Sequence, residues 1–152
     1  MIKLKKNKIE IPYEILTYEK YQNRINKLLN DNKTANVNPI FKHNTQVYTD
    51  CGFPIEHYSI GTGDKHILVM GGTHGCEIIS VDFVTQLMER IATGQIPNFS
   101  PDDFTIDFIP LHNPEGFIIS SSAADFMLKD KDSDEIEKFC KEYYLAYRQD
   151  DI

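Results

Sequence analysis

The chain has 152 residues, of which 41% are hydrophobic and 26% are charged, a composition typical of a globular protein with a hydrophobic core. Its 16 basic and 23 acidic residues give a net charge of -7, which disfavours nucleic acids and anionic membrane surfaces as partners. No apolar run approaches the roughly 18 residues that a membrane-spanning helix requires, so we expect no membrane association.

The amino-terminal segment and the cysteines indicate the cellular compartment of the protein. The basic run KLKKNK is followed by the mixed sequence IEIPYEI rather than by the apolar stretch of a secretory signal. The three cysteines, Cys51, Cys76 and Cys140, are odd in number and widely spaced, which favours free thiols over a disulfide framework. These features predict a cytoplasmic protein.

The first predicted helix covers residues 17–30, where apolar side chains repeat at the spacing of one helical face. The polar, asparagine-rich residues 31–39 predict a loop. Residues 46–60 then indicate two short strands joined by a turn at CGFP, and GTGDK leads the chain into the apolar run HILVM. The sequence thus predicts a hairpin followed by a buried strand.

The next predicted element is an amphipathic helix over residues 78–92. Gly94 and Pro97 mark its end. The segment FTIDFIP, starting at Phe104, alternates apolar and polar residues and predicts a half-buried strand, and LHNPEGF follows it as a turn. A third helix is predicted where apolar and aromatic residues repeat from Ile136 to Tyr147. Helices alternating with strands indicate an α/β domain.

The segment GGTHGCE, residues 71–77, lies between the predicted buried strand and the second helix. Loops at the carboxyl ends of strands are where α/β proteins place functional groups, and imidazoles and carboxylates are common zinc ligands. The adjacent glycines allow a sharp exit from the strand, and a spacing of three lets His74 and Glu77 converge. We therefore predict that His74 and Glu77 bind a metal ion. The competing interpretation is that both residues only cap the helix near Ile78.

A second motif, HNPEGF, ends the later strand. Together the two motifs resemble the zinc carboxypeptidase family, typified by pancreatic carboxypeptidase A. In that family a glycine-rich strand end leads into His-x-x-Glu, and a later strand ends in Asn-Pro-Asp-Gly and an aromatic residue. The segment YTDCGFPIEHYSIG, residues 48–61, is similar to the family's early hairpin. The resemblance is clearest over residues 18–117.

The resemblance implies an α/β fold with a mixed sheet flanked by helices, the zinc-carboxypeptidase-like (phosphorylase/hydrolase-like) architecture in truncated form, as one partial domain over residues 1–152. It implies zinc as the cofactor, with His74 and Glu77 as its first two ligands. The implied activity is that of a metallocarboxypeptidase, which hydrolyses C-terminal peptide bonds, with a peptide or small amide as substrate.

Part of the family's site has no counterpart in this sequence. The third zinc ligand is a histidine much later in the family's chains, and the general-base glutamate follows it, whereas this sequence ends at Ile152. The segment IISSSAADFMLKDKDSDEIEKFC, residues 118–140, contains no arginine, whereas the family has arginines after its Asn-Pro-Asp-Gly turn. We therefore expect the amino-terminal half of such a domain, assign no catalytic residue, and expect the isolated chain to hold zinc weakly and to turn over substrate poorly.

Three other hypotheses remain open. GGTHG also fits an aspartoacylase-like N-acyl amino acid deacylase, although NPEG favours the carboxypeptidase. Cys76 could act as a nucleophile beside His74, but residues two apart in a loop rarely reach the required geometry. A non-catalytic, truncated remnant would bind metal weakly and associate with a partner through an exposed sheet edge.

The other four histidines are not assigned to the metal site. His112 directly precedes NPEG, and the family position that it matches is not a ligand, so we expect a surface or hydrogen-bonded histidine. His43, His57 and His66 have no partner at metal-binding spacing in the sequence, and we expect them to be structural or solvent-facing.

Overall fold

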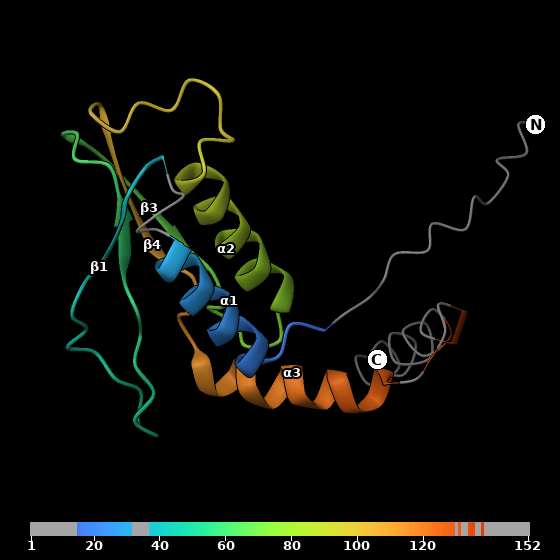
Figure 1. The fold of residues 1–152 in the computed structure, drawn as a ribbon. Coiled ribbons are helices and arrows are strands. Elements are labelled where there is room, and N and C mark those ends of the chain that lie inside the picture. Colours follow the sequence, from blue (N-terminus) through green and yellow to red (C-terminus); the bar gives the residue numbers. More distant parts are fainter. Residues whose placement is uncertain (1–14, 32–36, 130, 132–133, 136–137, 139–152) are drawn as a thin grey trace, which may run out of the picture. The chain divides into compact units, whose positions relative to one another are not determined.

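The computed structural model describes residues 15–31, 37–129, 131, 134, 135 and 138. The chain divides into two compact units, residues 16–123 and a second unit formed by residues 1–15 and 124–152. The first unit contains all the strands of the sheet (Figure 1). Among the described residues, no helix combines the length and the apolar character needed to cross a bilayer.

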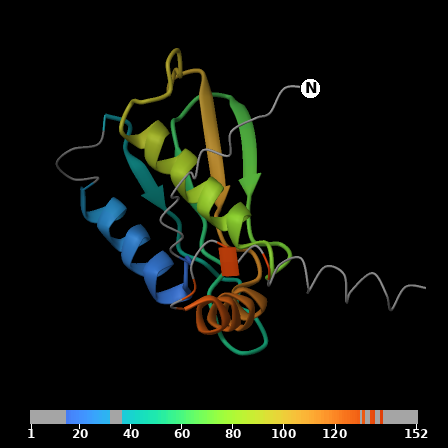
Figure 2. The same ribbon diagram turned by 90° about the vertical axis from the view of Figure 1, so that its right-hand side faces the viewer.

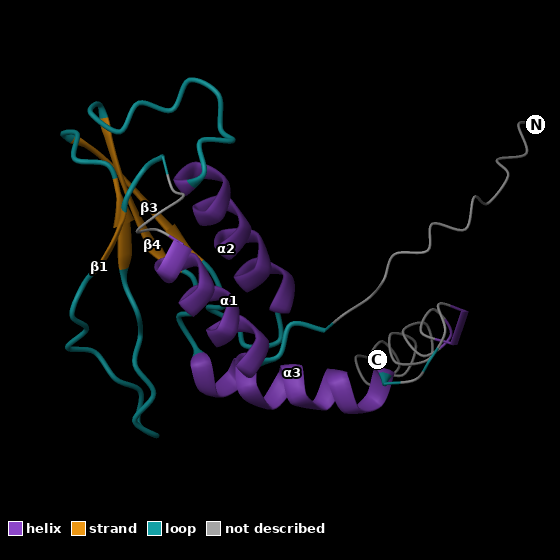
Figure 3. Cartoon of the chain, viewed as in Figure 1, coloured by secondary structure: helices purple, strands orange, loops and turns teal. Residues whose placement is uncertain are grey.

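A four-stranded mixed sheet forms the centre of the first unit (Figure 3). Its strands are β1 (Ile40–Lys42), β2 (Tyr58–Ile60), β3 (Lys65–Met70) and β4 (Phe104–Ile109), in the order β1-β2-β4-β3. The pairs β1–β2 and β2–β4 are antiparallel, whereas β3 and β4 are parallel. The parallel pair requires a crossover, which the intervening helix provides.

Helices α1 (Tyr18–Asp31) and α2 (Ile78–Ala92) lie on one face of this sheet (Figures 1 and 2). On β2 and β4 the residues that face the helices are buried, and Tyr58, Ile60 and Phe108 are fully inaccessible to solvent. The apolar stripe of α2 meets them through Val81, Val84 and Met88. Burial of these side chains is the main stabilising contribution, because each one removes apolar surface from water.

An ionic contact joins the two helices at their outer surface. The guanidinium of Arg24 on α1 contacts Oδ1 of Asp82 at 2.7 Å and Oε2 of Glu89 at 2.8 Å, both on α2. The two carboxylates are one helical heptad apart, so one fork-shaped donor group reaches both. The contact fixes the relative position of the helices that cover the sheet.

The helix predictions are correct for the first two helices. The second helix begins and ends at the predicted residues, and Gly94 follows its end with a positive φ of 72°. The first differs by one residue at each end. NPEGF is not only a turn, because a helix, α3 (Pro114–Leu128), starts within it. The helix predicted between Ile136 and Tyr147 lies outside the described residues.

The predicted hairpin is only partly correct. Its turn exists, since Gly52 has a φ of 85° and its N–H donates to the carbonyl of Thr49. Its first strand is reduced to a single bridge between Tyr48 and Pro54. Instead β2 pairs with β4 and with β1, a strand of three residues that the sequence did not indicate.

Candidate metal site

The two sequence motifs lie side by side because β3 and β4 run in parallel and end together. Beyond Met70 the hydrogen-bond ladder continues from the N–H of Gly71 to the carbonyl of Ile109, at 3.0 Å. The N–H of His112 then donates to Gly71 at 3.0 Å and that of Asn113 to Gly72 at 2.9 Å. Both motifs are therefore held at the carboxyl ends of adjacent strands, where α/β folds place their sites.

A tight turn brings His74 and Glu77 together. The N–H of Glu77 donates to the carbonyl of His74 at 3.0 Å, and Nδ1 of His74 lies 3.2 Å from Oε1 of Glu77. Their side chains are 71% and 54% exposed. The pair thus converges on one accessible point, as the spacing predicts.

The capping interpretation does not account for this pair. Glu77 occupies the N-cap position of α2, but its side chain makes no capping hydrogen bond. Instead the hydroxyl of Ser80 donates to the carbonyl of Glu77 at 2.7 Å and accepts the N–H of Gly72 at 2.9 Å. Because Ser80 ties the loop to the helix, the carboxylate of Glu77 is available to a ligand.

The pair fits two positions of a zinc site. Zinc bonds of about 2.1 Å to nitrogen and oxygen at a tetrahedral angle place the two ligand atoms about 3.4 Å apart. The observed 3.2 Å therefore needs little adjustment. Within the described residues, no third histidine, cysteine or carboxylate completes a metal-binding group with this pair.

Neighbouring groups do not complete the site. Cys76 is an exposed free cysteine and makes no hydrogen bond in the described part of the chain, whereas His74 faces Glu77, so a Cys76–His74 nucleophile pair has no support. His112 is half-buried, and its backbone N–H donates to the carbonyl of Gly71.

The residues of NPEG have structural roles. Oδ1 of Asn113 accepts the N–H of Gly116 at 2.9 Å, which caps α3, and Pro114 occupies its first turn. The carboxylate of Glu115 accepts the N–H of Cys51 at 2.8 Å. Hydrogen bonds from the Thr49 side chain and from the Cys51 backbone lower the pKa of Glu115 below its ordinary value. Glu115 thereby fastens α3 to the turn at residues 49–52.

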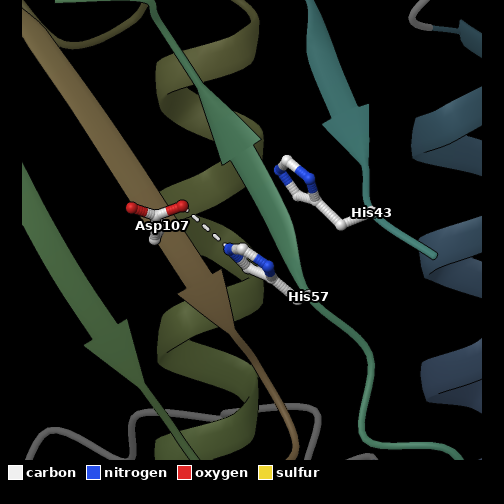
Figure 4. A group of neighbouring side chains, drawn as sticks. All are labelled: His43, His57 and Asp107. Carbon is white, nitrogen blue, oxygen red and sulfur yellow. Dashed lines mark hydrogen bonds and ion pairs between the residues drawn. The ribbon is translucent and has the colours of Figure 1, made fainter. Parts of the chain in front are cut away.

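A second group of potential ligands cannot be recognised from sequence spacing. His43, His57 and Asp107 bring their ligand atoms within 4.8 Å of one another (Figure 4). Burial alone raises the pKa of Asp107, but hydrogen bonds from His57 and His66 outweigh it and hold the pKa below its usual value. The sequence shows no partner at metal-binding spacing for these histidines because Asp107, which contacts both His57 and His66, lies on a neighbouring strand.

Comparisons with known proteins agree with this architecture. The family model of the zinc carboxypeptidases matches residues 17–141. Two solved structures share the fold: a protein assigned as a carboxypeptidase from Burkholderia mallei, with a TM-score of 0.54, and a metallo-carboxypeptidase from Burkholderia cenocepacia, with a TM-score of 0.52. Each is 18% identical, and the matches cover 71% and 68% of this chain. No curated protein matches the sequence.

The chain belongs to the zinc carboxypeptidase family, since the match covers most of its length. The expected mixed α/β sheet with flanking helices is confirmed. The matched region spans only 28% of either neighbour's chain. That residues 1–152 form a single partial domain stays a prediction.

Proposed function

We propose that this chain supplies the first two zinc ligands, His74 and Glu77, of a metallocarboxypeptidase that hydrolyses C-terminal peptide bonds. The observation that carries the proposal is the 3.2 Å separation of Nδ1 and Oε1, close to that of two ligands on one zinc ion. Membership of the zinc carboxypeptidase family supports the choice of metal and reaction.

The residues of the loop have defined tasks in this proposal. A bound zinc ion polarises a carbonyl group and lowers the pKa of a bound water. His74 and Glu77 hold the ion at the carboxyl end of β3, and their exposure leaves the opposite side open to a peptide. Ser80 keeps Glu77 in place by accepting from Gly72 and donating to the Glu77 carbonyl.

The third ligand and the general base must come from outside the described residues. Among the described strands β3 pairs only with β4, so its other edge is unpaired. The prediction that this strand is buried was wrong, because Ile67, Leu68 and Met70 are 44%, 59% and 40% exposed. An additional strand pairing with this edge would cover apolar surface and add residues beside His74, which makes the edge the proposed place of association.

Two alternatives make different predictions. An N-acyl amino acid deacylase would use the same pair on a small amide, and the family match favours the carboxypeptidase instead. A non-catalytic remnant would bind zinc weakly through His74 and Glu77 without turnover.

Zinc binding and hydrolysis of blocked tripeptides and N-acyl amino acids test the proposal. We expect the 152-residue chain to bind zinc weakly through this pair, with turnover near background because only two ligands are present. His74→Gln and Glu77→Gln should each weaken binding at this site, whereas His112→Gln should not. Zinc binding at the loop that survives both substitutions would contradict the proposal, and zinc-dependent peptidase activity of the pure chain would contradict the requirement for further residues.

A further inference from the structure

The register of the sheet brings two histidines together on the face opposite α1 and α2. In the β1–β2 pair Ile40 lies opposite Ile60 and Lys42 opposite Tyr58, so the next pair is His43 and His57. The N–H of His43 donates to the carbonyl of His57 at 3.0 Å, which continues the ladder. Since Tyr58 faces the helices and is fully buried, the preceding residue, His57, points to the other face.

Asp107 joins them from β4. It pairs with Ser59, two residues beyond His57, and so lies diagonally across from His57 on the same face. Nε2 of His57 is 2.8 Å from Oδ1 of Asp107, and Figure 4 shows the His57 ring directed at this carboxylate. The three ligand atoms, one from each residue, all lie within 4.8 Å of one another. Ligands of one zinc ion lie about 3.4 Å apart, and the lone pairs of an imidazole lie in its ring plane, so the stacked rings of His43 and His57 must turn relative to each other for both to bind one ion.

An ion pair explains only part of this arrangement. The carboxylate of Asp107 contacts His57 through one oxygen and His66 through the other, the latter at 3.4 Å. His43 has no carboxylate of its own in the described part of the chain, yet its ring stacks on that of His57, with centroids 4.2 Å apart and planes 16° apart. An ion pair with Asp107 therefore does not account for the position of the His43 ring.

The hydroxyl of Ser59 orients the ring of His43. Nε2 of His43 lies 2.8 Å from Oγ of Ser59, a residue that is only 5% exposed. Partners of this kind fix the ring orientation and tautomer of ligating histidines. Ser59 thus holds the His43 ring over His57 from a buried position in the sheet.

We propose that His43, His57 and Asp107 form a second metal site, of two imidazoles and one carboxylate, for a divalent transition cation such as Zn²⁺. Imidazole and carboxylate ligands favour the later first-row metals over Mg²⁺ and Ca²⁺. The three ligands come from the sheet face and leave coordination positions open to solvent. The site is separate in its residues from His74 and Glu77, and it does not depend on the function proposed for them.

Isothermal titration with Zn²⁺ tests the site when it is carried out on a His74→Gln/Glu77→Gln background. We expect this background to bind one equivalent of zinc, and His43→Gln or Asp107→Asn added to it to weaken that binding at least about tenfold. His112→Gln is the matched control, with binding unchanged. Circular dichroism verifies that each variant is folded.

A measurement on the unsubstituted chain tests the site independently. Substoichiometric Co²⁺ should broaden the ring NMR signals of His43 and His57 in addition to those of His74. No zinc binding by the His74→Gln/Glu77→Gln background, or binding that His43→Gln leaves unchanged, would overturn the second site. If His74 and Glu77 are not ligands, substituting these two residues will leave zinc binding unchanged. The two proposals can therefore fail separately.

Discussion

Gly75 and Gly116 lie in backbone contact and join the two family motifs. A Cβ atom added to Gly75 would lie 2.1 Å from the carbonyl carbon and 2.4 Å from the Cα of Gly116. These distances are far inside van der Waals contact, and the neighbour is backbone that cannot rotate away. Gly75 is therefore required because the loop of His74 and Glu77 packs directly on the first turn of α3.

Gly75→Ala should destabilise the fold by about 3 kcal/mol, since overpacking against fixed backbone forces the two motifs apart. The free energy of unfolding from urea titration measures this loss. Cys76→Ala, at the next and exposed position, is the matched control and should change stability by less than about 0.5 kcal/mol. Equal stability of the two variants would show that the close contact is not present in solution.

Arg24→Gln should lower the stability by about 1 kcal/mol or less at low ionic strength, because Arg24 bridges Asp82 and Glu89 on α2 at the surface. The effect should shrink in high salt as the charges are screened. Urea unfolding at two salt concentrations measures both. Arg90→Gln, on α2 and without an ion pair to any described residue, should show neither effect. A loss for Arg24→Gln that is independent of salt would contradict the electrostatic explanation.

Glu115→Gln should reduce the melting temperature at neutral pH more than at acidic pH. The lowered pKa of Glu115 means that its ionised form is favoured by folding, so the stabilisation is present above the ordinary pKa of 4.5. It is lost as the pH falls through the lower pKa of the folded state. Thermal unfolding of wild type and variant at pH 7 and near pH 3 measures the difference, and a gap that is the same at both would rule out this role for the ionised carboxylate.

Local sequence patterns predicted the elements whose signals are contained in one segment. The 3.6-residue period from Ile78 to Ala92 and the alternation within Phe104–Ile109 depend only on near neighbours and a buried face. The beginning of α3 was missed because Pro114 and Gly116 were interpreted as turn residues. An asparagine followed by proline is also a helix start, with the side chain as cap and proline in the first turn.

The two candidate metal sites also differ in whether the sequence could predict them. His74 and Glu77 are three positions apart, so one turn brings them together and their sequence spacing predicts it. His43, His57 and Asp107 meet only through the register of three strands, one of which, β1, has too few residues to leave a pattern. A cross-strand pair is visible in sequence only once the strands and their register are known.

A crystal structure of the chain grown with zinc, with anomalous diffraction collected at the zinc edge, tests the central claim most directly. The account predicts a peak bonded to both Nδ1 of His74 and Oε1 of Glu77, at about 2.1 Å from each. A structure in which these two side chains point apart, with no anomalous peak between them although zinc is bound elsewhere, would contradict it.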